Sequence, residues 1–162
     1  MDEREFDELY DASFRRLVAQ LYALTGSVHE AQDCVQEAFV RAWSHRHSLD
    51  RASHPEAWVR TTAHRLAVSR WRRAVRARRE PDRALAAAGV SPAPTETYVA
   101  LVAALQTLPA DQRRALVLHH IADLSVAEVA REVGAPEGTV KARLSRGRAA
   151  LAAQLDEGSH HV

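Results

Sequence analysis

The sequence predicts an all-α protein made of two small helical domains joined by a flexible linker, the second domain containing a helix-turn-helix. Apolar residues recur at three- and four-residue steps along most of the chain, which is the period of an amphipathic helix. The sustained two-residue alternation and hairpin turns that indicate strands are absent from the sequence. Within residues 80–96 the helical pattern gives way to a stretch rich in alanine, proline and glycine, which indicates the linker.

Size and composition limit the possible classes of protein. With 162 residues and 46% hydrophobic content, the chain can bury the core of one ordinary domain or of two small ones. No apolar run approaches the roughly 18 to 20 residues of a membrane span, and the chain starts with acidic residues where a secretory signal would be basic. We therefore expect a cytoplasmic protein without membrane insertion. A single cysteine, Cys34, excludes an internal disulfide and a thiolate zinc cluster.

The first predicted domain, residues 1–79, begins with two amphipathic helices. The first helix covers residues 5–24 and ends at Gly26. Ser27 and Glu30 have the spacing of a capping box, in which each side chain bonds the backbone of the other, so a second helix starts there. Its apolar stripe leaves a polar surface for a partner, formed by Asp33, Gln36, Glu37 and Arg41.

A third helix of this domain follows the loop at residues 45–52. Ser53 and Glu56 repeat the capping-box spacing around Pro55, which is tolerated in the first turn of a helix. The helix then enters a block, residues 65–79, with seven arginines and no acid. Such a block attracts a polyanion, although a solvated helix face is the plainer interpretation.

The second predicted domain, residues 97–162, contains the helix-turn-helix. Helical patterns cover residues 98–105 and 110–122. Ser125 and Glu128 form a third capping box, which opens a short helix that stops at Gly134. After a turn at residues 134–136, a longer helix covers residues 137–155. A short helix that braces a longer one across a tight turn is typical of DNA-binding proteins.

The long helix has two distinct faces. Val140, Leu144, Gly147 and Leu151 cluster on the side that must be buried. Arg146 on the opposite side can make two hydrogen bonds to a guanine edge, and small residues there let the helix approach DNA closely. The predicted DNA-contacting residues are Gly138, Thr139, Lys141, Ala142, Arg143, Ser145, Arg146 and Arg148, with Arg143 and Arg148 near the phosphates. The alternative is a three-helix bundle with a solvated cationic face.

Other functional classes find less support in the sequence. The nine histidines form no cluster with the ligand spacing of a zinc site, so we expect no catalytic residue, no metal and no cofactor. His119 and His120, for example, are too close in sequence to share a helix face. A stand-alone helix-turn-helix regulator is the main rival interpretation. Such a regulator commonly carries a phosphoacceptor domain, and the first domain has neither strands nor an acidic phosphorylation pocket.

Sequence motifs in both domains resemble those of a known family. Residues 124–130 (LSVAEVA) and 136–148 (PEGTVKARLSRGR) closely resemble region 4.2 of the extracytoplasmic-function sigma factors of bacterial RNA polymerase, within the sigma-70 family. Residues 30–43 (EAQDCVQEAFVRAW) are similar to regions 2.1 to 2.2, and residues 57–60 (AWVR) with 63–73 are similar to regions 2.3 and 2.4. Arg65 is a departure, because many members carry asparagine there.

The resemblance implies a sigma factor that binds core RNA polymerase, directs it to specific promoters and assists promoter opening. It implies docking on the polymerase clamp helices through Asp33, Gln36, Glu37 and Arg41. It implies contact with the minus-10 element through Trp58, Thr61, Thr62, Arg65, Arg70, Arg72 and Arg73, although Trp58, like Trp43, has a competing role in core packing. The second domain would bind the minus-35 element and the polymerase flap, and an anti-sigma factor is a candidate further partner.

Overall fold

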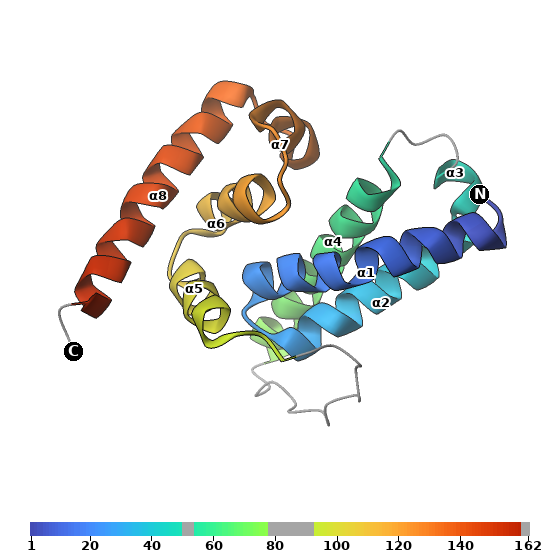
Figure 1. The fold of residues 1–162 in the computed structure, drawn as a ribbon, viewed down its shortest axis with the longest axis horizontal. Coiled ribbons are helices and arrows are strands. Elements are labelled where there is room, and N and C mark those ends of the chain that lie inside the picture. Colours follow the sequence, from blue (N-terminus) through green and yellow to red (C-terminus); the bar gives the residue numbers. More distant parts are fainter. Residues whose placement is uncertain (50–53, 78–92, 160–162) are drawn as a thin grey trace. The chain divides into compact units, whose positions relative to one another are not determined.

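The computed structural model describes residues 1–49, 54–77 and 93–159, which divide into two compact units, Met1–Pro92 and Ala93–Val162 (Figure 1). Every regular element in these ranges is a helix, so the all-α prediction is confirmed. Most of the predicted linker, together with Ser53 and its predicted cap, lies outside the described residues. No helix in the described ranges combines the length and the apolar character that crossing a bilayer requires.

Unit 1 contains helices α1 (Glu3–Thr25), α2 (Val28–Ser44), α3 (Arg46–Leu49) and α4 (Pro55–Ala77). The Asp2 side chain caps α1 and forms a reciprocal capping box with Glu5, so the helix starts two residues before the predicted position. At Ser27 only half of the predicted box forms. Ser27 accepts from the Glu30 amide, but its own amide donates to Oγ1 of Thr25 rather than to Glu30.

The core of unit 1 forms where α2 packs against both α1 and α4. Its fully buried side chains include Leu17 and Leu21 of α1, Val35 of α2 and Val59 of α4. An aromatic cluster extends this core along α1 and α2, with ring centroids 4.8 to 6.1 Å apart, and it consists of Phe6, Tyr10, Phe14, Phe39 and Trp43. Phe39 is buried at the centre of this cluster, and its ring contacts with Phe6, Tyr10 and Phe14 help to hold the two long helices together.

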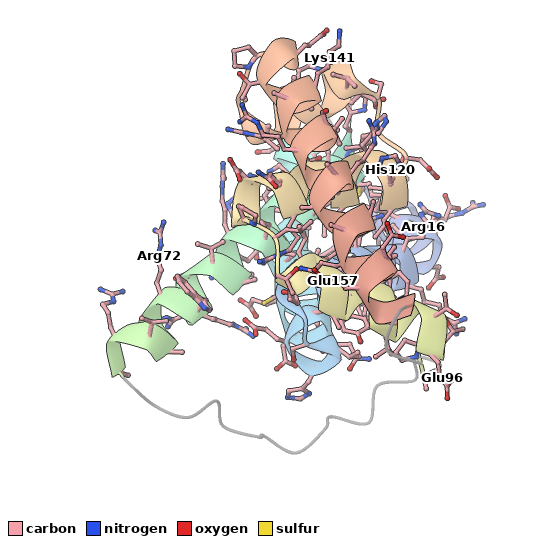
Figure 2. The ribbon with its side chains drawn as sticks, turned by 90° about the vertical axis from the view of Figure 1, so that its left-hand side faces the viewer. Arg16, Arg72, Glu96, His120, Lys141 and Glu157 are labelled. Carbon is pink, nitrogen blue, oxygen red and sulfur yellow. The ribbon has the colours of Figure 1, made fainter. Side chains whose placement is uncertain are left out.

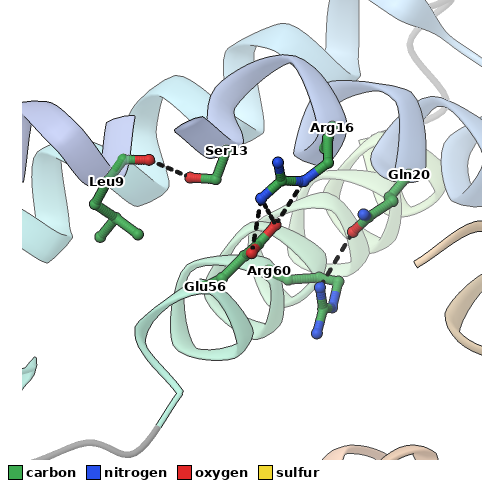
Figure 3. Close-up of polar contacts among 6 residues, drawn as sticks. All are labelled: Leu9, Ser13, Arg16, Gln20, Glu56 and Arg60. Atoms are coloured by element: carbon green, nitrogen blue, oxygen red, sulfur yellow. Dashed lines mark hydrogen bonds and ion pairs between the residues drawn. The ribbon is translucent and has the colours of Figure 1, made fainter. Parts of the chain in front are cut away.

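Two polar contacts join α1 to α4 (Figure 3). The Arg16 guanidinium donates two hydrogen bonds from Nη2 to the Glu56 carboxylate, at 3.1 and 3.2 Å. One turn further along each helix, the buried Arg60 donates to the Gln20 side chain at 3.2 Å. A buried guanidinium needs such partners, because desolvating it otherwise costs several kcal/mol. These contacts fix the orientation of α4, which carries the arginine block.

Unit 2 contains α5 (Glu96–Gln106), α6 (Ala110–Leu116), the π-helix η1 (Val117–Ile121), α7 (Val126–Val133) and α8 (Glu137–Ser159). Arg113 of α6 holds the end of α5, because it donates to the backbone carbonyls of Leu105 at 2.9 Å and Leu108 at 3.0 Å. The prediction of one α-helix over residues 110–122 was wrong for the second half of that range, where the structure has the π-helix η1 instead.

The helix-turn-helix forms as predicted. Ser125 and Glu128 complete a reciprocal capping box at the start of α7. Gly134 ends α7 in the left-handed region, with φ of 70°, which favours glycine because it has no Cβ. After the turn, α8 begins at Glu137 and packs against both α6 and α7. The short helix thus braces the long one, as DNA recognition in the major groove requires.

Candidate nucleic-acid interface

One side of α8 is buried and the other is open. Val140 is fully buried and Leu144 is 2% exposed, and both belong to the core of unit 2. On the opposite side the exposed residues are Gly138, Thr139, Lys141, Ser145 and Arg146, and Ala142 is half-buried. Figure 2 shows Lys141 projecting from the amino-terminal part of α8. The predicted DNA-contacting face is therefore not covered by the packing of unit 2.

Two arginines at the edges of this face have partners within unit 2. The Nε atom of Arg143 lies 3.5 Å from a carboxylate oxygen of Asp111 in α6. The Nε of Arg148 donates to Nε2 of His120 at 3.1 Å. Partial burial, Arg148 and His119 together lower the pKa of His120, which favours the neutral imidazole that this bond needs as its acceptor. A phosphate contact would compete with these intramolecular contacts.

A close helix contact fixes α8 on α6. A Cβ added at the buried Gly147 would lie 2.9 Å from Cδ1 of Leu116 and 3.2 Å from its Cγ. Only a glycine lets the two helices approach this closely without displacing the leucine. The position of the exposed face of α8 is thus set by packing on its other side.

The polar face of α4 combines most of the residues predicted for the minus-10 element. Steps of three and four residues align Trp58, Thr62, Arg65 and Arg72 on one face, which also contains Ser69 and Arg76. Arg65, Arg72, Arg73 and Arg76 are exposed, whereas Trp58, Thr61 and Thr62 are half-buried. Figure 2 shows Arg72 extending away from α4. Four exposed guanidinium groups on one helix make a strongly cationic surface.

Arg70 differs from the other arginines of the block. It is half-buried on the α2 side of α4, where its charge acts on Glu30 and Cys34. Burial raises the pKa of Glu30, and Arg70 opposes that shift. Burial also raises the pKa of the Cys34 thiol to about 11, so the thiol stays protonated at neutral pH. The structure therefore does not bring Arg70 together with the arginines of the α4 face.

The polar face of α2 bears the four residues predicted to contact a partner. Gln36 is exposed, and the Glu37 carboxylate lies 3.4 Å from Nε of Arg41 one turn later. Asp33 lies 3.5 Å from Nε2 of His29. Val40 is 57% exposed on the same surface. The sequence interpretation did not include Val40, although its position among charged residues and outside the apolar stripe of the helix could have indicated an exposed apolar residue. An apolar residue within a charged rim is compatible with a protein-binding surface.

Unit 2 also has an apolar groove. Leu101, Leu105, Leu151 and Leu155 line it together with residues of α6 and η1, and His120 and Arg148 form its polar edge. No metal-binding group of three or more histidine, cysteine, aspartate or glutamate side chains occurs in the described parts of the chain. The rings of His119 and His120, which are adjacent in η1, nonetheless lie 4.8 Å apart in edge contact. Their adjacency in sequence argued against a shared helix face, but it does not keep the two rings apart.

Comparison with known proteins identifies the family. The family model for sigma-70 region 2 matches residues 9–77, and the model for sigma-70 region 4 matches residues 98–151. The ECF RNA polymerase sigma factor SigW of Bacillus subtilis is 31% identical over 174 aligned positions, covering 95% of this chain and 90% of SigW. The chain belongs to the extracytoplasmic-function sigma factors. SigM of Mycobacterium tuberculosis, a further member, is 30% identical and covers 95% of this sigma factor and 79% of its own length.

Solved structures agree with this assignment. The sigma factor RpoE of Bartonella quintana, solved in complex with the anti-sigma factor NepR, matches with a TM-score of 0.78 and 26% identity. The match covers 94% of this sigma factor and 98% of RpoE. The prediction of a sigma factor that directs RNA polymerase to promoters is thus confirmed, and a stand-alone regulator is not favoured.

Proposed function

We propose that this sigma factor initiates transcription through three surfaces, on α2, α4 and α8. Residues 1–79 would contact core polymerase and the minus-10 element, residues 80–96 would link the two domains, and residues 97–162 would contact the minus-35 element. The observation that carries the proposal is the two-sided α8, which buries Val140 and Leu144 and leaves the side with Arg146 open. The activity would take place in the cytoplasm, because its proposed partners, RNA polymerase and promoter DNA, are located there.

The α8 face would contact the minus-35 duplex through its major groove. Arg146 is exposed and suits a bidentate contact to a guanine edge. Gly138 is exposed, and a Cβ there would meet nothing within 4 Å, so the fold itself does not require glycine. Its missing side chain would let the start of α8 approach the DNA backbone. Arg143 and Arg148 would contact phosphates, either in addition to their intramolecular partners or in place of them.

The α4 face would hold the minus-10 element. Arg65, Arg72 and Arg73 are exposed and can follow a phosphate backbone, and Trp58 is half-buried about two turns before Arg65 on the same helix. Because Arg70 is held on the α2 side, we assign it a supporting role beside Glu30 rather than a direct DNA contact. Thr61 and Thr62 are half-buried, and the Thr62 hydroxyl donates to the Trp58 carbonyl at 2.9 Å.

The α2 face would dock on the clamp helices of the polymerase, and the apolar groove of unit 2 would receive the polymerase flap. Asp33, Gln36, Glu37 and Arg41 surround the exposed Val40, which gives the surface an apolar centre and a charged rim. An anti-sigma factor is a further proposed partner, because the similar sigma factor RpoE of Bartonella quintana was solved in complex with the anti-sigma factor NepR. It would act by covering these same surfaces.

Run-off transcription with core polymerase tests the proposal. We expect specific transcripts only when the full chain and core polymerase are combined, with weak promoter binding by the chain alone. Strong specific binding by the chain alone, without polymerase-dependent transcripts, would instead support the stand-alone regulator.

Charge reversal on α2 tests the docking surface separately. Asp33→Lys with Glu37→Lys should abolish association with core polymerase while leaving the helical content and melting temperature close to those of the parent. The matched control is Asp7→Lys with Asp11→Lys, which makes the same charge change at exposed positions of α1. If the α2 double variant still forms holoenzyme, or if the control loses binding equally, the docking assignment is wrong.

A further inference from the structure

Trp71 is the most exposed large hydrophobic residue in the described ranges. Its relative exposure is 64%, compared with 38% for Trp43, which packs on Phe6. Scattered apolar residues are normal on a protein surface and need no explanation. Trp71 is not isolated, however, because Val75, one turn later on α4, is 55% exposed. Together they form an apolar strip at the carboxyl end of the helix.

The surroundings of this strip are cationic. Arg72 and Arg76, the residues that follow Trp71 and Val75 in sequence, are both exposed, and the sequence from Arg65 to Arg79 contains no acid. An acidic or neutral partner with flat apolar groups would complement both features. Nucleic acid has this combination, because it carries phosphates and presents bases and sugars to which aromatic rings bind.

We propose that the ring of Trp71 makes a non-ionic contact with promoter DNA, at a nucleotide held by Arg72 and Arg76. The proposal rests on the proposed function of the α4 face and extends it. Trp71 follows Trp58 by 13 positions, which corresponds to about 20 Å along a helix. The two rings therefore contact different nucleotides. Trp71 adds affinity that does not depend on salt, unlike the arginines around it.

Holoenzyme binding by Trp71→Ala tests the proposal. The probes are a promoter defined by transcript mapping, once as full duplex and once as a forked template with an unpaired minus-10 strand, each at two salt concentrations. We expect Trp71→Ala to weaken binding on the order of tenfold, by a similar factor at both salt concentrations. Trp71→Phe should retain most of the affinity. A loss confined to the forked template assigns the ring to an unpaired base, and an equal loss on both templates assigns it to the paired segment.

Matched variants separate the ring from the charges and from the polymerase. Val75→Ala removes an equally exposed apolar side chain without a ring and should change affinity less than about twofold. Arg72→Ala should lower affinity most at low salt and reduce the salt dependence. Normal DNA binding by Trp71→Ala would overturn the proposal, as would equal losses in Trp71→Ala and Val75→Ala. Weakened association with core polymerase would show that the ring contacts protein instead.

Fluorescence of the free chain tests whether the ring is available. In the variant Trp43→Phe with Trp58→Phe, Trp71 is the single tryptophan. We expect red-shifted emission and efficient quenching by acrylamide, as for a solvated indole. Blue-shifted, protected emission would show that another part of the chain, such as residues 78–92, covers Trp71, and this would overturn the proposal. If the parent holoenzyme binds neither template, the proposed function itself fails, whatever the fluorescence shows.

Discussion

Arg146→Ala separates DNA recognition from fold stability. Arg146 is exposed on α8, and truncating an exposed side chain away from the core changes the free energy of unfolding by less than about 0.5 kcal/mol. A lost bidentate contact to a base costs about 1 to 3 kcal/mol of discrimination. We therefore expect a loss of roughly 5- to 150-fold in binding to the preferred minus-35 sequence, with an unchanged melting temperature.

The control is Arg143→Ala, a substitution nearly one turn before Arg146 on a different side of α8. The Arg143 side chain is 28% exposed and paired with Asp111, whose side chain is 55% exposed. An ion pair of this kind contributes about 0 to 1 kcal/mol, so Arg143→Ala should lower stability slightly and weaken binding about equally on all sequences.

The assay is holoenzyme binding to a set of promoters with each minus-35 base pair changed in turn. For Arg146→Ala, the preference at one or two base pairs should disappear while the other preferences remain. If Arg146→Ala weakens binding by the same factor on every sequence, Arg146 contacts phosphate and the reasoning about the base edge is refuted.

Three further predictions concern residues of unit 2. Gly134→Ala should destabilise the protein by about 1 to 2 kcal/mol, because φ there is 70°. The change Gly138→Ala, at a helical position with open space around it, should stabilise the protein by up to ~1 kcal/mol while weakening minus-35 binding. Melting temperatures that shift in the same direction for both variants would contradict these two predictions. The lowered pKa of His120 means that the folded state favours the neutral imidazole. The contribution of His120 to the free energy of unfolding is therefore fully present above about pH 6.5 and declines as the pH falls below that value. Melting temperatures from pH 5 to 8 should therefore decline less toward low pH in His120→Gln than in the parent, and identical profiles would refute the assignment.

The sequence was sufficient for the helices and the helix-turn-helix because their signals are local. Ser125 and Glu128 define a helix start within four residues, and Gly134 defines an end. The same local logic failed at Ser27, where Thr25 takes the amide that the predicted box needed. The π-helix after Leu116 was also missed, because no residue pattern within it distinguishes the i→i+5 hydrogen bonds of a π-helix from the i→i+4 bonds of an α-helix.

Parts of the site could not be predicted because they depend on contacts between distant helices. Arg60 looks like one more surface arginine in the sequence, yet it is 4% exposed and bonded to Gln20. Arg70 and Arg143 lie in cationic runs that predict DNA contact, but their side chains face Glu30 and Asp111. Which arginines of a run face a neighbouring helix follows from the packing angle, and the sequence does not contain that angle.

Footprinting of a mapped promoter tests the central claim, that the α4 and α8 surfaces act on separate promoter segments only within the polymerase complex. The predicted result with the chain and core polymerase together is protection of the minus-35 duplex and permanganate reactivity of thymines in the minus-10 element. The chain alone should give neither signal. Full protection by the chain alone, or a minus-10 element that stays paired with both components present, would contradict the account.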